Sequence, residues 1–192
     1  SVSEQHTVRG GYAHDLKRRG FRFEVALPAL DGAGPGGGLY PRLDELGVLD
    51  RVEFVQIDPF YTARFGDFEI TVPASLPEYL DELKARFPEE DAGIDGLFAA
   101  VSRVAGDVGR YGEERASGTK ATPLEMLERY PDMATAFSQD WRTFMSAYLT
   151  DERLQAVVST LWGYLGLPPS KVSAGLFALA LHSYHTHGAW SP

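Results

Sequence analysis

The first residues with a recognisable chemical use lie close to the start of the chain. Glu4 follows Val2 in a short strand-like stretch, and Gly10 and Gly11 come six residues later. In dinucleotide-binding folds, an acid at the end of the second strand binds the ribose hydroxyls, about 20 residues after a glycine-rich turn that holds the phosphates. Only three residues precede Glu4, so this turn is not in the chain. The spacing alone therefore predicts no complete nucleotide site.

A second pattern is the histidine group His182, His185 and His187 near the C-terminus. Two histidines three residues apart on a helix can share a metal ion. However, no Asp or Glu follows Glu152, and imidazoles are also favourable at the negative end of a helix dipole. We therefore nominate no metal site, and a metal-dependent enzyme remains a third hypothesis.

Aromatic residues are abundant in the middle and the last third of the chain. Core packing explains such a set, and the wall of a long apolar pocket is the functional alternative. The sequence has no G-x-S-x-G, H-E-x-x-H or phosphate-loop motif, and its 27 acids show no evident acid/base pair, so no catalytic residue is nominated. The aromatic residues in question are Phe60, Tyr61, Phe65, Trp141, Phe144, Trp162, Tyr164, Phe177 and Tyr184.

Composition excludes several classes of function. The net charge of -9 argues against nucleic acid as a partner, because phosphate binding needs clustered Lys and Arg. The absence of cysteine excludes disulfides and thiol catalysis. No apolar run reaches the roughly 18 residues that span a bilayer. We therefore expect a cytoplasmic protein whose contact with a membrane, if it makes one, is peripheral.

The pattern of apolar residues predicts β-structure first and helices afterwards. Strands are expected within residues 21–30 and 52–57, and a hairpin over 60–72 turns at Gly66 and Asp67. The glycine-rich stretch 31–38 is interpreted as a flexible break, followed by a short helix that ends at Gly47. The predicted class is α+β, with a small, mostly antiparallel sheet covered by a helical layer.

Helical periodicity begins at residue 75. Ser75 with Glu78, and Thr122 with Glu125, are spaced as capping boxes at helix starts. One longer helix is predicted from Met133 to about residue 149, another over about 154–165, and a last, buried helix over about 171–185.

Taken together, these segments resemble the carotenoid desaturases and their relatives. The run "EQHTVRGGYAHDLKRRGFRFEVALPALDG" is similar to the family segment E-x-x-x-x-x-GG followed by G-[FY]-x-F-[DE]. The closing run "LWGYLGLPPSKVSAGLFALALHSYHTHGAWSP" is similar to a second family landmark, in which a helix leads into G-x-W-x-P. The family includes phytoene desaturases, carotenoid isomerases and retinol saturases, and belongs to the FAD-dependent amine-oxidase-like oxidoreductases.

The resemblance implies a cofactor role for the opening residues. Glu4 would bind the adenosine ribose of FAD, and Gly10 and Gly11 would let the backbone approach the cofactor. Tyr12 stands where many relatives have an Arg near the pyrophosphate, and this departure leaves that contact open. Residues 1–32 would then be a remnant of an α/β FAD-binding domain, and residues 33–49 a connecting segment.

The resemblance also implies that residues 50–192 form a substrate domain, with its sheet at about 52–73 and its helices at about 76–187. Its apolar tunnel would take a polyene or another lipid-like small molecule. The chain then looks like an internal fragment of a larger oxidoreductase, with FAD in the parent, and by itself neither binding FAD tightly nor competent as an enzyme. The expected tunnel residues are Leu30, Phe60, Tyr61, Trp162, Tyr164, Phe177 and Tyr184.

Besides the metal-dependent enzyme, the sequence leaves two interpretations open. In the first, the parent transfers a hydride between an apolar substrate carbon and the flavin, as a desaturase, a saturase or an isomerase. In the second, the chain is a non-enzymatic helical module that binds a lipophilic ligand or a partner protein. The oligomeric state is undetermined at this stage.

Overall fold

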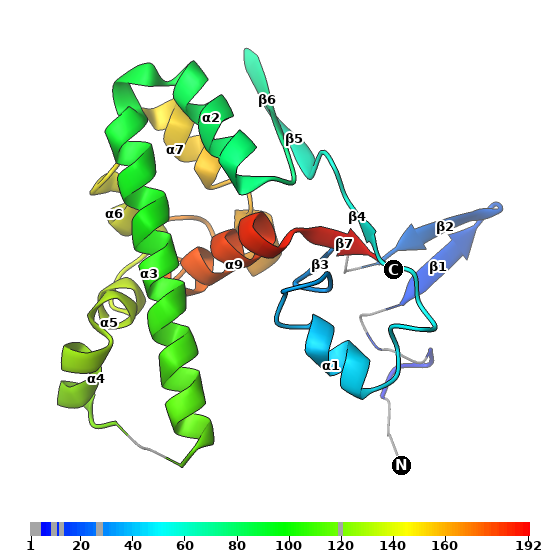
Figure 1. Cartoon of the computed structure of the whole chain (residues 1–192). Coiled ribbons are helices and arrows are strands. Elements are labelled where there is room, and N and C mark those ends of the chain that lie inside the picture. The colour runs from blue at the N-terminus through cyan, green and yellow to red at the C-terminus, as the bar shows by residue number, and fades with distance from the viewer. Residues whose placement is uncertain (1–4, 9–10, 12–13, 26–28, 119–120) are drawn as a thin grey trace.

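The computed structural model describes residues 5–8, 11, 14–25, 29–118 and 121–192. In this part of the chain, most helices gather on one side, and the short helix near residues 40–45 lies with the strands on the other (Figure 1). Every strand pairing that the structure describes is antiparallel. The predicted α+β class is therefore confirmed.

The described strands form three small sheets instead of the single predicted one. One hairpin pairs β1 with β2, another pairs β5 with β6, and β7 lies between β3 and β4. The β5–β6 hairpin turns at Gly66 and Asp67, as predicted, with Phe65 opposite Phe68. The strands are β1 (Asp15–Arg18), β2 (Phe21–Glu24), β3 (Leu30–Asp31), β4 (Val55–Gln56), β5 (Tyr61–Phe65), β6 (Phe68–Val72) and β7 (Ala189–Ser191).

The glycine-rich stretch is a packed turn, and the prediction of a flexible break is wrong. The indole of Trp190 lies so close to Gly34 that a Cβ there would meet it at 2.0 Å. The carbonyl of Gly32 accepts hydrogen bonds from the N–H groups of Leu39 and Tyr40, at 3.1 and 3.0 Å. Glycine is needed here because backbone and indole approach closely, not because the chain needs freedom.

Two helices begin at the caps that the sequence predicts, Ser75 and Thr122. Thr122 and Glu125 form a complete capping box, with hydrogen bonds of 3.3 and 2.8 Å in the two directions. At Ser75 the hydroxyl accepts from the Glu78 N–H at 3.5 Å. The helices are α1 (Tyr40–Glu45), α2 (Leu76–Arg86), α3 (Asp91–Ala116), α4 (Pro123–Arg129), α5 (Pro131–Phe137), α6 (Trp141–Ser146), α7 (Glu152–Val158), α8 (Trp162–Leu165) and α9 (Ala174–His187), with a 3₁₀ turn, η1, at Pro88–Glu90.

Two of the predicted long helices are each broken into two. The first break lies between α5 and α6, where the Asp140 carboxylate accepts from the Thr143 N–H at 2.9 Å and so caps a new helix. The Trp141 N–H bonds to the Val172 carbonyl, at 2.9 Å, instead of to its own helix. The second break, between α7 and α8, follows Ser159. Apolar periodicity continues across both breaks, which is why it concealed them.

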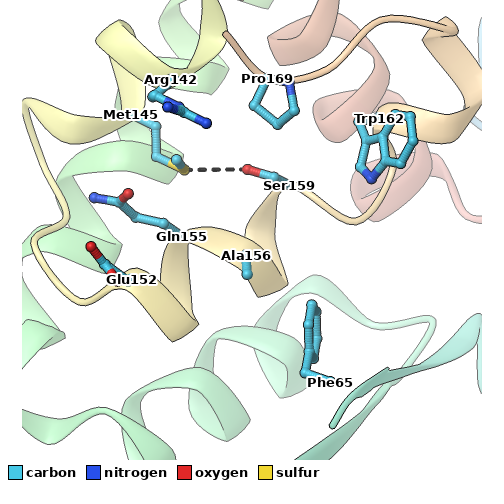
Figure 2. A pocket seen from close by; sticks show the side chains of 9 residues that line it. All are labelled: Phe65, Arg142, Met145, Glu152, Gln155, Ala156, Ser159, Trp162 and Pro169. Atoms are coloured by element: carbon cyan, nitrogen blue, oxygen red, sulfur yellow. Dashed lines mark hydrogen bonds between the residues drawn. The ribbon is translucent and has the colours of Figure 1, made fainter.

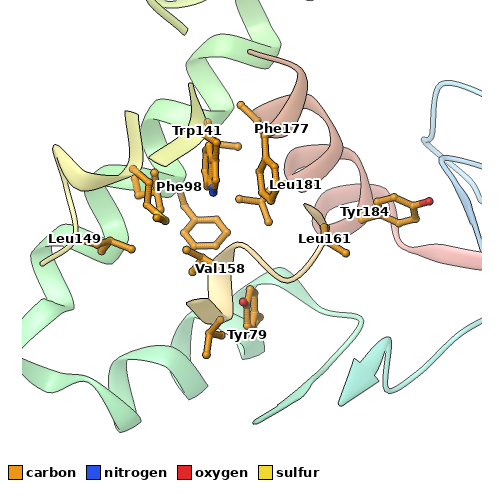
Figure 3. Close-up of a cluster of buried hydrophobic side chains, with 14 of the residues drawn as sticks. Tyr79, Phe98, Trp141, Leu149, Val158, Leu161, Phe177, Leu181 and Tyr184 are labelled. Atoms are coloured by element: carbon orange, nitrogen blue, oxygen red, sulfur yellow. The ribbon is translucent and has the colours of Figure 1, made fainter. Parts of the chain in front are cut away.

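The core lies where α3 crosses α9, and α2, α5, α6 and α7 cover it (Figures 1 and 3). The inner face of α3 presents apolar side chains at spacings of three and four residues. Helix α9 is largely buried, as predicted, although Leu176 is half exposed. The buried apolar residues of α3 are Ile94, Leu97, Phe98, Ala100, Val101 and Val104.

Two buried acids join α3 to later helices. Asp107 accepts from the N–H groups of Asp132 and Met133 at the start of α5, at 2.9 and 3.1 Å. Glu90 accepts from the Thr150 hydroxyl and from the N–H groups of Thr150 and Asp151. The Thr150 hydroxyl, followed by these backbone donors, lowers the pKa of Glu90. Both acids therefore act as structural caps.

None of the helices in the described part of the chain combines the length and the apolarity needed to cross a bilayer.

Candidate functional site

Four of the seven predicted tunnel residues contact one another at the junction between strands and helices. The ring of Phe60 lies 4.8 Å from that of Tyr61 and stacks on Tyr184 at 5.1 Å. Tyr164 of α8 lies 5.3 Å from Tyr184. Together with Tyr79, Phe98 and His185, these side chains are called the aromatic cluster below.

His185 is a polar residue inside this cluster. Its ring stacks on Tyr79 at 4.6 Å and meets the edges of Phe60 and Phe98 at 6.0 and 6.5 Å. The side chain is 3% exposed, and neither ring nitrogen has a hydrogen-bond partner among the described residues. Burial lowers the pKa of His185 to about 4, so the imidazole is neutral at physiological pH.

Three tyrosines of the cluster share this buried environment, whereas Tyr164 is about half exposed. Burial raises the pKa of Tyr184 to about 12, and it also raises the pKa of Tyr61 and Tyr79. The Tyr184 hydroxyl donates to the carbonyl of Ala29 at 3.3 Å, and thus ties α9 to the segment that leads into β3. The cluster therefore contains neutral hydrogen-bonding groups within an aromatic environment.

The other three predicted tunnel residues lie elsewhere. Phe177 is fully buried and stacks on Trp141 at 4.4 Å, deep in the core (Figure 3). Leu30 lies on β3, opposite Trp190 of β7. Trp162 is half exposed and lines a separate pocket. The structure thus places four of the seven residues together.

This second feature, called the Trp162 pocket, lies between β5 and the helices α6 to α8 and has a volume of about 530 Å³ (Figure 2). Its volume is in the range of small-molecule sites. The apolar part of its lining is Phe65, Met145, Ala156, Trp162 and Pro169, and the polar part is Arg142, Glu152, Gln155 and Ser159.

The polar lining differs in how much of its hydrogen-bonding capacity is already used. Ser159 accepts from the Trp141 indole N–H at 3.0 Å and donates to the Met145 sulfur at 3.5 Å. Gln155 donates from Nε2 to the Leu149 carbonyl at 2.8 Å, which leaves its Oε1 as an acceptor. In the described part of the chain, the Arg142 and Glu152 side chains have no ion pair and no hydrogen bond.

The Trp162 pocket and the aromatic cluster share two elements. Strand β5 turns Tyr61, Ala63 and Phe65 to its more buried face, because alternate residues of a strand share a face. Tyr61 belongs to the cluster and Phe65 to the pocket, about 13 Å apart along the strand by the rise per residue. Helix α8 likewise contributes Tyr164 to the cluster and Trp162 to the pocket.

A shallow groove of about 620 Å³ runs between α3 and α9. Its lining is mostly small residues, with His182 and His187 at 6.1 Å between ring centroids. Burial, and to a smaller extent His187, lowers the pKa of His182. Among the described residues, no group of three or more His, Asp or Glu side chains is placed to hold a metal ion.

Of the four predicted FAD contacts, the structure describes one. Glu4, Gly10 and Tyr12 lie outside the described residues. Gly11 has a φ of +60°, and its carbonyl accepts from the Nδ1 of His14 at 2.5 Å. A positive φ is readily adopted by glycine because it has no Cβ, and Gly11 stays a predicted FAD contact.

The chain was compared with protein families and with curated proteins. No family model matches it. Over its full length it is 27% identical to proteins named all-trans-retinol 13,14-reductase from Rattus norvegicus and Danio rerio, and 97% of it is 25% identical to the Homo sapiens protein of that name.

Those curated relatives are about three times as long as this chain, which covers 32 to 33% of their length. The match supports the retinol saturase branch among the relatives that the sequence motifs resemble.

Sequence reasoning did not select the polar residues of the Trp162 pocket. Helix periodicity places polar residues such as Arg142, Glu152 and Gln155 on the surface and gives no reason to select them. Only the break between α5 and α6, together with the turn before α7, directs them to one cavity. The available local signal was the aspartate that precedes each helix, Asp140 and Asp151, because each is an N-cap.

Proposed function

We propose that this chain is the substrate-binding part of a flavin-dependent oxidoreductase that acts on an apolar, polyene-like substrate by hydride transfer. The observation that carries the proposal is the similarity of the whole chain to retinol reductases, whose name specifies reduction of a double bond in a polyene alcohol. The chain contributes an apolar environment that orients the substrate and excludes water.

In this proposal, residues 1–32 belong to the cofactor-binding part. Residues 33–49 form a connecting segment, and residues 50–192 form the substrate-binding domain. Glu4, Gly10, Gly11 and Tyr12 would contact FAD, and the positive φ of Gly11 supports this assignment. The flavin supplies the hydride chemistry when it is bound. The residues of this chain hold the substrate, and we assign no acid or base to them.

The substrate path that we propose follows the more buried face of β5. It runs from the Trp162 pocket toward the aromatic cluster, between Phe65 and Trp162 at one end and Tyr61 and Tyr164 at the other. A path bounded by aromatic rings suits a conjugated chain, which offers flat apolar surface along its whole length.

Binding of all-trans-retinol tests this proposal, with the fluorescence of the ligand itself as the measurement. A ligand of about 21 heavy atoms at about 0.3 kcal/mol per atom gives a Kd on the order of 20 μM. We expect the double variant Phe65→Ala, Trp162→Ala to weaken binding at least about tenfold, because two aromatic walls are lost.

The matched control is Phe21→Ala, which removes a more exposed ring from β2, far along the chain from the pocket. It should bind retinol as the wild type does. Binding that does not saturate, or that weakens equally in the control, would contradict the proposal.

Contact with a membrane surface is part of the same proposal, because such substrates partition into lipid. The β1–β2 hairpin supports it, because Leu16, Phe21 and Phe23 are exposed large apolar side chains. Three cations, Lys17, Arg18 and Arg19, lie at or near its turn in an otherwise acidic chain, whereas Arg22 is paired with Asp15. Exposed aromatics beside cations suit an anionic lipid surface.

We expect flotation with phosphatidylserine-containing vesicles, and loss of flotation in a Phe21→Ser, Phe23→Ser variant. Leu124→Ser, Leu127→Ser serves as the control, since these two leucines of α4 are comparably exposed. Equal flotation of all three proteins would show that the membrane contact lies outside the β1–β2 hairpin. Absence of flotation in the wild type would contradict the proposed membrane contact.

A further inference from the structure

The Trp162 pocket has opposite charges at one end and aromatic rings at the other (Figure 2). Arg142 lies in the first turn of α6 and Glu152 at the first residue of α7, so two separate helix starts bring the charges to one cavity. Neither side chain has an ion pair or a hydrogen bond in the described part of the chain, whereas most other arginines there are paired.

These groups differ in what they offer a ligand. A guanidinium only donates hydrogen bonds, and a carboxylate only accepts them. Gln155 adds a further acceptor, because its Nε2 is engaged with the Leu149 carbonyl and its Oε1 is not. The charged end of the pocket therefore presents both donors and acceptors, with formal charges that cancel.

A ligand head group that both donates and accepts matches this end best. A hydroxyl donates its proton to Glu152 or Gln155 and accepts from Arg142. A carboxylate gains from Arg142 but is repelled by Glu152, and an aldehyde oxygen accepts from Arg142 while leaving both acceptors unused. The apolar body of the ligand would lie against Phe65, Trp162 and Pro169.

We propose that Arg142 and Glu152 form a head-group recognition pair, which selects a lipophilic alcohol over the corresponding acid. This inference rests on the proposed function, since it takes the Trp162 pocket as the place where the apolar substrate binds. It adds the two residues that set which end group is accepted, and it assigns Glu152 the role of excluding carboxylates.

A purely structural role for Glu152 is the competing explanation. An acid in the first turn of a helix interacts favourably with the helix dipole, and its removal would cost a little stability. Such a role would not change which ligand is preferred. The ratio of two ligand affinities therefore separates the explanations, because a general loss of folded protein affects both ligands equally.

The experiment measures the Kd of all-trans-retinol and of all-trans-retinoic acid, which share the polyene and differ in the head group. The wild type should bind retinol about tenfold more tightly than the acid. In Glu152→Gln, the affinity for the acid should rise about tenfold, so that the preference disappears or reverses. In Arg142→Gln, the acid should lose more affinity than retinol does.

Glu89→Gln is the matched control, because it removes an exposed acid near another helix start without touching the pocket. It should keep the wild-type preference. The inference is overturned if retinol binds and Glu152→Gln leaves the ratio of the two affinities unchanged. If the wild type binds neither ligand, the proposed function is contradicted, and the inference with it. The two results can be told apart, because retinol binds in the first and not in the second.

Discussion

Between pH 7 and pH 5, the wild-type chain is expected to lose about 2 kcal/mol of its free energy of unfolding through His185, and the variant His185→Phe should not show this loss. The reason is that the imidazole is buried as a neutral base against Tyr79, Phe60 and Phe98. Burial holds the pKa of His185 at about 4 in the folded chain, whereas the ordinary value of 6.5 applies once the chain is unfolded.

The sign follows from proton binding. Between pH 6.5 and about 4 the unfolded chain takes up a proton at His185 and the folded chain does not, so acidification favours unfolding. This contribution to stability is complete above pH 6.5 and is lost progressively down to about pH 4. The full shift corresponds to about 3 kcal/mol, of which about 2 kcal/mol falls between pH 7 and pH 5.

Urea denaturation at several pH values, followed by circular dichroism, gives the measurement. At pH 7 the phenylalanine variant should be at least as stable as the wild type, because two unpartnered nitrogens are replaced by carbon. Tyr79→Phe is the control: it alters the same cluster but removes no group that titrates in this range, so it should keep the wild-type pH dependence. An unchanged pH dependence in His185→Phe would show that the imidazole is not buried as described.

Gly93→Ala is expected to destabilise the chain by about 2 kcal/mol, although alanine is the better helix former. A Cβ at Gly93 would lie 2.4 Å from the carbonyl oxygen of Tyr148, and a backbone atom cannot rotate away. The segment that joins α6 to α7 would have to move, together with the hydrogen bonds between Glu90 and Thr150. Overpacking of this kind costs about 1–3 kcal/mol.

The same substitution at Gly112 should have the opposite sign. Gly112 lies in the same helix, α3, and a Cβ there would meet no atom within 4 Å. Gly112→Ala should therefore stabilise the chain by about 0.5–1 kcal/mol through helix propensity alone. Free energies of unfolding from urea titrations of both variants decide the matter, and two changes of the same sign would be inconsistent with the packing described for Gly93.

These two glycines illustrate how far local reasoning extends in this chain. Both are the same residue type in one helix, and nothing in the neighbouring sequence separates them. Their difference comes from Tyr148, which is 55 residues away from Gly93 along the chain and touches it only in the folded state. Long-range packing of this kind is not encoded in local periodicity.

The sequence by itself determined the features that depend on neighbouring residues. The α+β class, the β5–β6 hairpin with its Gly66–Asp67 turn, and the capping box at Thr122 follow from spacing and turn chemistry, which act over a few residues. The motifs at the two ends of the chain likewise indicated the carotenoid desaturases and their relatives, a group that includes the retinol saturases, because such motifs are local runs.

The tertiary structure alone decided the features that depend on distant segments. It closed the glycine-rich stretch against Trp190, divided the long helices at Asp140 and Ser159, and buried His185 without a partner among the described residues. It also directed Arg142 and Glu152 into one pocket with Trp162. The physical reason is the same in each case: burial and charge environment are set by which surfaces meet in space, and spacing along the chain does not record that.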